Sequence, residues 1–257
     1  MGRLFALVSG GGSPGVTTAA IALALTWPTE VIVAECDPGG GDILAGMLAG
    51  HVPAARGLME HAIHAGQDSH SAAIALGTQL VPLDAARGRT FLPGLTDPRQ
   101  AVGLAPAWRA VALSLTAQRA DVIADCGRLD AGGAQPTAVL EEAQTVALVL
   151  RPTLRQVWSA RPRVEILTQL LGGTDRLVLM LTGPGTHTTH DVAQALQMPV
   201  AAALPEDVRG AALLSDGIGA RSRIRTAPLV RSAGVAGAAL RRHADVPTSS
   251  RSAVVAR

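Results

Sequence analysis

A glycine-rich loop and two aspartates are the parts of this sequence whose residue types and spacing suit phosphate chemistry. Gly10, Gly12 and Gly15 fit the pattern G-x-G-x-x-G between an apolar run that predicts a strand and one that predicts a helix. The free N–H groups and the dipole at a helix N-terminus favour an anion there. Asp37 and Asp125 come at the ends of two further strand-like runs, where a parallel sheet holds its ligands.

Two kinds of nucleotide site fit this loop. In a dinucleotide-dependent enzyme, an acid about twenty residues later binds the ribose, and Glu35 or Asp37 would take that place. In a P-loop protein, "GSPGVTT" supplies backbone donors, Thr17 a hydroxyl for Mg²⁺, and Asp125 a carboxylate for the magnesium water shell. Asp37 can then orient an attacking water. We favour the P-loop, because common dehydrogenase chemistry needs a Tyr and a Lys and this chain has neither.

Four segments together resemble the ParA/MinD partition ATPases. They are "GGGSPGVTT", "AECDPGGGD", "DVIADCGR" and "LPEDVRGAALLSDG", which are similar in order and spacing to that family's deviant Walker A, switch I, Walker B and adenine-side segments. The resemblance covers residues 2 to about 242. It implies a SIMIBI-class P-loop fold, bound Mg²⁺ with ATP or ADP, and a nucleotide-sandwich homodimer. It also implies a cytoplasmic role in positioning DNA, division machinery or surface appendages.

The resemblance assigns roles residue by residue. Catalytic roles fall to Asp37 and Asp125, and Mg²⁺ would be held through water by Thr17 and Asp125. Pro205 and Asp207 would flank the adenine. The loop that holds the phosphates comprises Gly10, Gly11, Gly12, Ser13, Pro14, Gly15, Val16, Thr17 and Thr18.

The loop departs from the family pattern K-G-G-x-G-K-T at both lysines. Gly11 and Val16 stand in their places, and all 22 basic residues of the chain are arginine. Each lost charge-assisted contact should cost ~1.5–3 kcal/mol of binding, and a lost transition-state donor ~10²–10³ in rate. We therefore expect weak nucleotide binding with weak or absent hydrolysis. Arg128 and Arg151, which follow two predicted strands, are candidates to compensate.

Strand-like and helix-like runs alternate along the chain, which predicts a doubly wound α/β fold, a mostly parallel sheet with helices on both faces. We expect one domain over residues 1–243 and a disordered tail over 244–257. The predicted strands are Leu4–Ser9, Glu30–Cys36, Gln79–Leu83, Thr90–Pro93, Asp121–Cys126, Thr145–Leu150, Arg176–Leu181 and Val200–Leu204. The predicted helices are Thr17–Thr26, Gly57–Ala65, Pro106–Arg119, Ala134–Glu142, Thr153–Leu171, His190–Leu196 and Leu229–Arg242.

Charge and hydropathy limit the partners. A net charge of +2 argues against a dedicated polyanion binder, and the cluster Arg221, Arg223 and Arg225 has no interleaved aromatic residue, so non-specific DNA binding is not favoured. No run of ~18 uncharged apolar residues could span a bilayer, and we expect a cytoplasmic protein. The sequence thus predicts an ATP-dependent switch for partitioning or positioning, with a partner protein. A non-hydrolysing scaffold of the pilus or secretion type, and a dinucleotide-dependent enzyme, remain alternatives.

Overall fold

One eight-stranded sheet forms the centre of the computed structural model, which describes residues 1–43, 45–48, 56–65, 69–130, 132–217 and 221–246. Its strand order is β3-β4-β2-β5-β1-β6-β7-β8. All neighbouring strands run parallel except β3 and β4, which are antiparallel. The strands are β1 (Leu4–Ser9), β2 (Val31–Glu35), β3 (Val81–Asp84), β4 (Arg89–Leu92), β5 (Asp121–Arg128), β6 (Thr145–Leu150), β7 (Leu177–Thr182) and β8 (Val200–Leu204).

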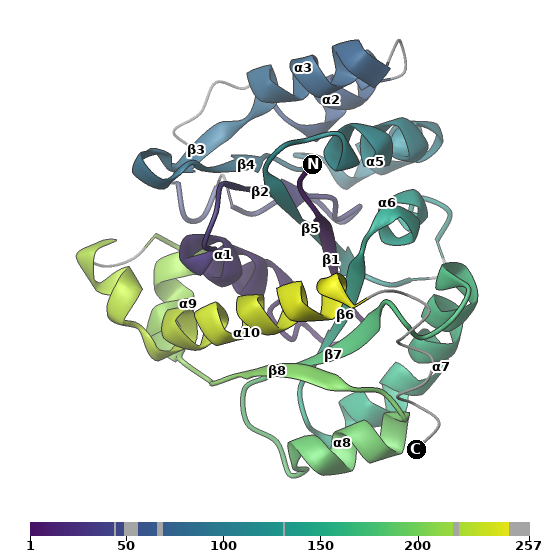
Figure 1. The fold of residues 1–257 in the computed structure, drawn as a ribbon, viewed down its shortest axis with the longest axis vertical. Coiled ribbons are helices and arrows are strands. Elements are labelled where there is room, and N and C mark those ends of the chain that lie inside the picture. The colour runs from purple at the N-terminus through teal and green to yellow at the C-terminus, as the bar shows by residue number, and fades with distance from the viewer. Residues whose placement is uncertain (44, 49–55, 66–68, 131, 218–220, 247–257) are drawn as a thin grey trace.

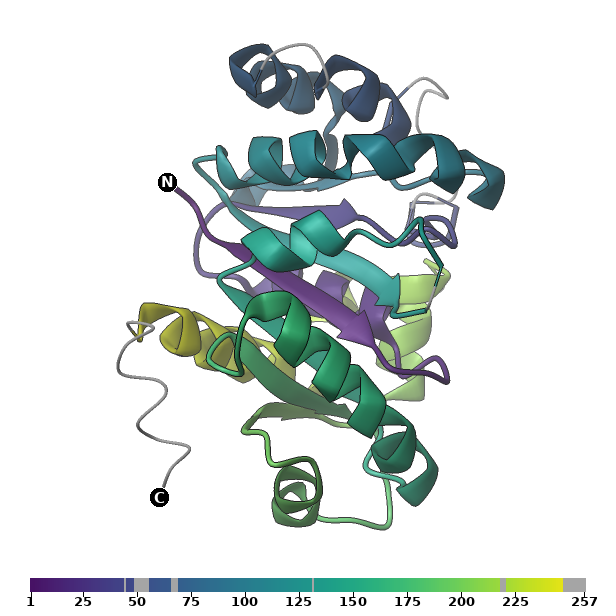
Figure 2. The same cartoon turned by 90° about the vertical axis from the view of Figure 1, so that its right-hand side faces the viewer.

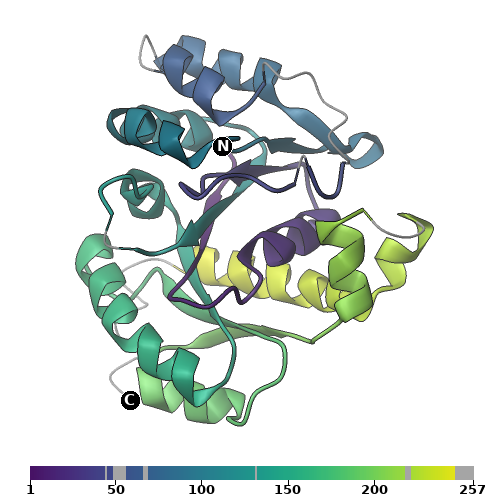
Figure 3. The same ribbon diagram turned by 180° about the vertical axis from the view of Figure 1, so that it is seen from behind.

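Helices cover both faces of the sheet (Figures 1 and 2). On one face, α1, α9 and α10 lie side by side, as Figure 3 shows, and their apolar residues share one core cluster with the sheet. On the other face, α2, α3, α5, α6, α7 and α8 contribute to a second cluster. The helices are α1 (Val16–Thr26), α2 (Leu58–Ala65), α3 (Ser69–Gln79), α4 (Ala101–Leu104), α5 (Trp108–Thr116), α6 (Thr137–Glu142), α7 (Leu154–Leu171), α8 (Thr189–Leu196), α9 (Val208–Ser215) and α10 (Pro228–Asp245). Four short 3₁₀ turns complete the described elements, at Ala85–Arg87, Pro98–Gln100, Ala105–Ala107 and Arg221–Thr226.

The central strands are mostly apolar because both of their faces are covered. Every residue of β1, β2, β6 and β7 is buried. The alternation that marks a half-exposed strand occurs at the edge, in β3, where Val81 and Leu83 are buried and Pro82 is exposed. Proline is tolerated there because an edge strand has a side with no ladder hydrogen bonds.

The predicted doubly wound, mostly parallel α/β fold is confirmed. Strands β1, β6 and β8 have the predicted bounds, whereas α3, α4 and α9 are helices that the sequence analysis did not predict. The last helix continues to Asp245, three residues beyond its predicted end, so residues 244 and 245 are helical rather than part of a disordered tail. Residues 247–257 of that predicted tail lie outside the described residues.

Because these strands are parallel, their C-terminal ends lie at the same edge of the sheet; the strands are β1, β2, β5, β6, β7 and β8. The loops that leave this edge include the glycine-rich loop and the segments that carry Asp37, Arg128, Arg151 and Pro205. The predicted site residues are thereby gathered on one side of the molecule.

Within the described part of the chain, no helix is both long and apolar enough to cross a membrane.

Candidate functional site

The glycine-rich loop has a backbone that only glycine adopts easily. Gly11, Gly12 and Gly15 have φ values of 155°, 64° and 93°, in the range that a β-carbon disfavours. Gly15 is the N-cap of α1 and has no side chain with which to cap it. The first N–H groups of α1 therefore remain for a ligand at the positive end of the helix dipole.

Two neighbouring elements hold this loop in place. Thr182, at the end of β7, donates its hydroxyl hydrogen to the carbonyl oxygen of Pro14 at 2.8 Å. On the other side, a β-carbon on Gly12 would lie 3.1 Å from the amide nitrogen of Gln156 in α7. The loop thus lies between β7 and α7 and is joined to β7 by the Thr182 hydrogen bond.

Asp125 lies in β5 and is buried next to Thr17, the second residue of α1. Its carboxylate is buried, is hydrogen-bonded to the Thr17 hydroxyl, and accepts the N–H of Gly127 at 3.0 Å. Burial is the main reason that its pKa rises to about 6, and the negative charges of Asp37 and Asp42 act in the same direction. The hydroxyl–carboxylate pair predicted for magnesium is therefore assembled.

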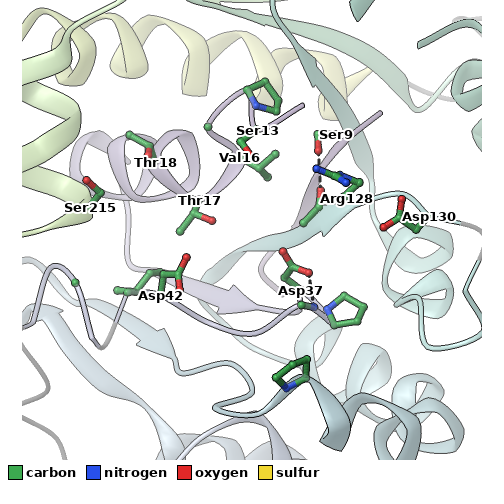
Figure 4. Close-up of a pocket in the computed structure, with 18 of the residues that line it drawn as sticks. Ser9, Ser13, Val16, Thr17, Thr18, Asp37, Asp42, Arg128, Asp130 and Ser215 are labelled. Carbon is green, nitrogen blue, oxygen red and sulfur yellow. Dashed lines mark hydrogen bonds between the residues drawn. The ribbon is translucent and has the colours of Figure 1, made fainter. Parts of the chain in front are cut away.

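A bulge in β5 directs the residues that follow Asp125. The pairing of β1 with β5 passes from Leu7–Asp125 to Ser9–Arg128, so β5 has one extra residue in this interval. Gly127 lies there with φ 61°. Such bulges bend a strand and re-aim its side chains next to functional sites. Arg128 consequently points into the cavity that Asp37 faces (Figure 4).

Asp37 approaches the same space from the loop after β2. Its carboxylate accepts the N–H of Gly39 at 2.7 Å. Partial burial raises the pKa of Asp37, the carboxylates of Asp42 and Asp130 add to this rise, and Arg128 opposes it. Figure 4 shows Thr17 and Asp37 entering the cavity from opposite sides. The charge of Asp37 also raises the pKa of Asp125, so the two predicted catalytic acids lie close together.

The cavity around these groups has a volume of about 1010 Å³. A second cavity of about 400 Å³ lies against the other side of the loop. The two cavities share the loop residues Ser13, Pro14, Gly15 and Thr18 together with Ser215 and Asp216 at the end of α9. A long molecule held at the loop could therefore extend into both.

The predicted base-side residues line the second cavity, but Asp207 is already engaged. Its two carboxylate oxygens accept the N–H groups of Gly210 at 2.9 Å and Leu229 at 3.2 Å, and so it caps α9. Pro205 forms part of the same wall. Arg151, predicted as a compensating phosphate contact, lines this second cavity and not the first, whereas Arg128 lines the first.

Val16, at the position of the P-loop lysine, has an apolar side chain and brings no positive charge to the loop. Its side chain is 6 % exposed and packs in the apolar cluster with Leu7 and Ile21, although it also borders the larger cavity. That cavity is lined by the carboxylates of Asp37, Asp42, Asp130 and Asp216, and Arg128 is the basic residue among its described lining. A phosphate ligand would therefore need a cation of its own here, because like charges at close range disfavour binding.

Two further acids lie at this edge: Glu35, which the sequence analysis named only as a ribose acid of the dinucleotide alternative, and Asp42, to which it gave no role. The carboxylate of Glu35 is buried and accepts the N–H groups of Ile43 at 2.9 Å and Gly94 at 3.0 Å. It joins the loop after β2 to the loop after β4, so it is not free to bind a ribose as the dinucleotide alternative requires. Burial raises its pKa to about 7. The run Gly39–Gly41 is the signal in the sequence, because a β-carbon on Gly41 would lie 2.7 Å from the Glu35 carboxylate.

The residues present fit a magnesium nucleotide better than a metal alone. Where the chain is described, no group of three or more His, Cys, Asp or Glu side chains is arranged to hold a metal ion. Thr17 and Asp125 supply one hydroxyl and one carboxylate, and Mg²⁺ in proteins commonly takes its remaining ligands from waters and phosphates. The open glycine loop next to them is suited to those phosphates.

Comparison with known proteins shows which solved structures have a similar fold. The sequence matches no protein-family model and no curated protein. Its structure is similar to a ParA family ATPase from Chlorobium tepidum TLS, with 16 % identity, a TM-score of 0.73, and coverage of 93 % of this chain and 99 % of that one. It is also similar to MinD from Pyrococcus horikoshii OT3 in complex with Mg-ADP, with 19 % identity, a TM-score of 0.70, and coverage of 92 % and 95 %.

A third similar structure is a plasmid partition protein from Borrelia burgdorferi B31 bound to AMPPNP, with 12 % identity, a TM-score of 0.70, and coverage of 94 % and 99 %. All three likenesses extend over nearly the whole of both chains. With its mostly parallel sheet, helices on both faces and a glycine loop after β1, the chain has the fold of the ParA and MinD ATPases.

Proposed function

We propose that this protein binds a magnesium nucleotide, ATP or ADP, and acts as a nucleotide-dependent switch in partitioning or positioning. The observation that carries the proposal is the glycine loop with the Thr17–Asp125 pair directly beneath it. The loop offers backbone donors for phosphates, and the pair offers ligands for the water shell of Mg²⁺. Two of the structurally similar proteins were solved with Mg-ADP or AMPPNP bound.

Binding should depend strongly on the divalent cation. Four carboxylates line the larger cavity, and the lysine position of the loop is occupied by an apolar side chain that is nearly buried. Mg²⁺ neutralises phosphate charge that the protein leaves uncompensated. Without Mg²⁺, repulsion between the phosphates and Asp37, Asp42 and Asp130 opposes binding.

Hydrolysis should be weak or absent, because no ammonium group reaches the phosphates. Arg128 is the candidate to replace part of that charge, since it borders the larger cavity and lowers the pKa of Asp37. The absence of lysine also favours a second candidate function, a non-hydrolysing scaffold of the pilus or secretion type. The two functions share the nucleotide site and differ in whether phosphate is released.

We further propose a homodimer in the cytoplasm that acts with a partner protein of a partition, pilus or secretion system. One similar structure is a complex of MinC and MinD from Aquifex aeolicus, with 14 % identity and a TM-score of 0.68. Non-specific DNA binding is not favoured. Arg225 of the basic cluster is paired with Asp84 at 3.4 Å, and the side chains of Arg221 and Arg223 lie outside the described part.

Isothermal titration with Mg-ATP and Mg-ADP, each repeated in EDTA, tests the proposal. We expect saturable binding with Mg²⁺, at least about tenfold weaker binding in EDTA, and loss of the Mg²⁺ effect in Asp125→Asn. Phosphate release measured on the same samples separates the slow ATPase from the scaffold. An absence of both heat and thermal stabilisation at millimolar nucleotide would refute the nucleotide function, and binding of NAD in preference to ATP would favour the dinucleotide alternative.

A further inference from the structure

The second cavity lies over the ends of three neighbouring strands. Arg151 follows β6, Thr182 ends β7 and Gly183 follows it, and Glu206 lies in the loop that follows β8. Because β6, β7 and β8 are adjacent in the sheet, these three segments form one continuous rim. This rim is the part of the cavity that the phosphate-side cavity does not share.

Two of the polar side chains on this rim have their hydrogen bonds committed to the protein. The Thr182 hydroxyl donates to the Pro14 carbonyl at 2.8 Å. The Asp207 carboxylate uses one oxygen for the N–H of Gly210 and the other for that of Leu229. The Thr182 hydroxyl has therefore used its single hydrogen, and each Asp207 oxygen already accepts one N–H.

Arg151 and Glu206 are engaged differently. Their closest charged atoms, Nη1 and Oε1, are 3.6 Å apart, which is an ion pair but too long for a hydrogen bond. Both side chains are about half exposed, at 42 % and 48 %. A guanidinium and a carboxylate therefore stand next to each other at the cavity rim with donors and acceptors available.

The backbone that carries Arg151 is well fixed. Its N–H donates to the side-chain oxygen of Gln156 at 2.7 Å, and its carbonyl accepts the N–H of Thr153 at 2.8 Å. The guanidinium lies against Gly183, where a β-carbon would be 3.7 Å from Cζ. Fixing the base of a long side chain reduces the conformational entropy that it loses when it binds a ligand.

We propose that Arg151 and Glu206 are the base-reading pair of the site and that they bind the hydrogen-bonding edge of a purine. This inference rests on the proposed nucleotide function. The carboxylate accepts from an amino or ring N–H, while the guanidinium donates to the neighbouring ring nitrogen or carbonyl oxygen. Leu204, Pro205 and Val208 supply apolar surface in the same cavity for the faces of the ring.

This assignment differs from a phosphate role for Arg151. The larger cavity, which holds Thr17, Asp37 and Arg128, is not lined by Arg151 in the described structure. The two roles make opposite predictions for a ligand that has phosphates but no base. Inorganic pyrophosphate with Mg²⁺ is such a ligand.

Titration of the full-length protein with Mg-ADP, Mg-GDP and Mg-pyrophosphate separates these roles. The variants are Arg151→Gln and Glu206→Gln. Arg109→Gln and Glu142→Gln serve as matched controls, because Arg109 and Glu142 form another surface pair, at 2.6 Å, between α5 and α6. We expect each test variant to weaken binding of the preferred purine nucleotide about tenfold and to leave pyrophosphate within about twofold, since charged hydrogen bonds carry effects of this size. The control variants should change neither.

The purine nucleotide that shows the larger loss identifies the base. Equal weakening of pyrophosphate and nucleotide in Arg151→Gln would overturn the inference and return Arg151 to the phosphates. Unchanged binding of both ADP and GDP in both test variants would overturn it as well. If the unsubstituted protein binds pyrophosphate but neither purine nucleotide more tightly, the phosphate site stands and the base-reading pair fails. If it binds none of the three, the proposed function itself fails.

Discussion

The carboxylate of Asp37 occupies the space that a side chain on Gly127 would fill. A β-carbon at residue 127 would overlap the Asp37 carboxylate group. Gly127 also has φ 61°, at the bulge of β5. A glycine at the end of one strand thus lets an acid from the loop after the neighbouring strand reach the cavity.

Substituting Gly127 should therefore have two effects: a left-handed backbone cost, which a control variant isolates, and a clash with the Asp37 carboxylate. Gly172, at the end of α7, has φ 68°, and a β-carbon there would meet nothing within 4 Å, so Gly172→Ala carries only the left-handed backbone cost of ~1–2 kcal/mol. Gly127→Ala should destabilise by more than this and should also weaken Mg-nucleotide binding. Urea denaturation and calorimetry measure the two effects. Equal stability losses in the two variants would show that Asp37 moves aside without cost.

The loop tether from Thr182 to Pro14 offers a second matched pair. Thr182→Val leaves the buried Pro14 carbonyl without this donor and should cost ~1–2 kcal/mol of stability while weakening pyrophosphate binding. Thr145, in β6, is also buried, but its hydroxyl has no hydrogen-bond partner among the described residues. Thr145→Val should therefore be neutral or stabilising by up to ~1 kcal/mol. A destabilisation in Thr145→Val as large as that in Thr182→Val would contradict this account.

Stability should fall as the pH rises through the acid range, because two buried acids have raised pKa values. The pKa of Glu35 rises from 4.5 to about 7 on folding, and that of Asp125 from 3.8 to about 6. The folded state binds more protons than the unfolded state between these values, so ∂ΔG/∂pH of unfolding is negative there. The favourable contribution is complete below about pH 4 and is lost by about pH 7.

Glu35→Gln should flatten this pH dependence, since it removes one of the two titrations. The measurement is the urea midpoint at intervals from about pH 4.5 to 8, a range that spans both raised pKa values. Glu165→Gln, at an exposed position on α7, is the control and should leave the slope unchanged. A slope in Glu35→Gln as steep as in the unsubstituted protein would show that Glu35 does not titrate in this range.

Restoring the loop lysine is the fourth test. Val16 borders the larger cavity, so the stem of a lysine can replace the valine in the apolar cluster while its ammonium reaches the phosphates. Val16→Lys should bind Mg-ATP about tenfold more tightly than Val16→Met, which has a long side chain without the charge. Phosphate release should also rise. Equal affinity of the two variants would mean that the loop does not hold phosphates at this position.

The sequence predicted the centre of the fold better than its periphery. Continuous apolar runs such as those of β1 and β6 can only be buried, so their bounds were predicted correctly. By contrast, α9 is short and contains Gly210, a weak helix former, and its start depends on the cap from Asp207. The same Asp207 was assigned to the adenine, because a sequence does not show which hydrogen bonds a carboxylate has already made.

Thr17, Asp37 and Asp125 were each located from one strand and its loop, and the structure brings them to the same edge of the sheet, while their roles stay predictions. Arg128 and Arg151 look equivalent in the sequence, since each follows an apolar run. The strand order separates them: β5 lies on one side of β1, whereas β6 lies on the other. This order comes from long-range pairing, and a single sequence does not reveal it. For the ribose acid of the dinucleotide alternative, the sequence left both Glu35 and Asp37 open, because the direction of each side chain depends on the loops that pack against it.

The loop residues Ser13, Pro14 and Gly15 border both cavities, so a movement of the loop changes the shape of both cavities. Thermodynamic linkage requires that any change one occupant makes in its neighbour's affinity be matched in the reverse direction. A ligand that moves these loop residues from one cavity would change the affinity of the other cavity, and the effect would be equal in the reverse direction.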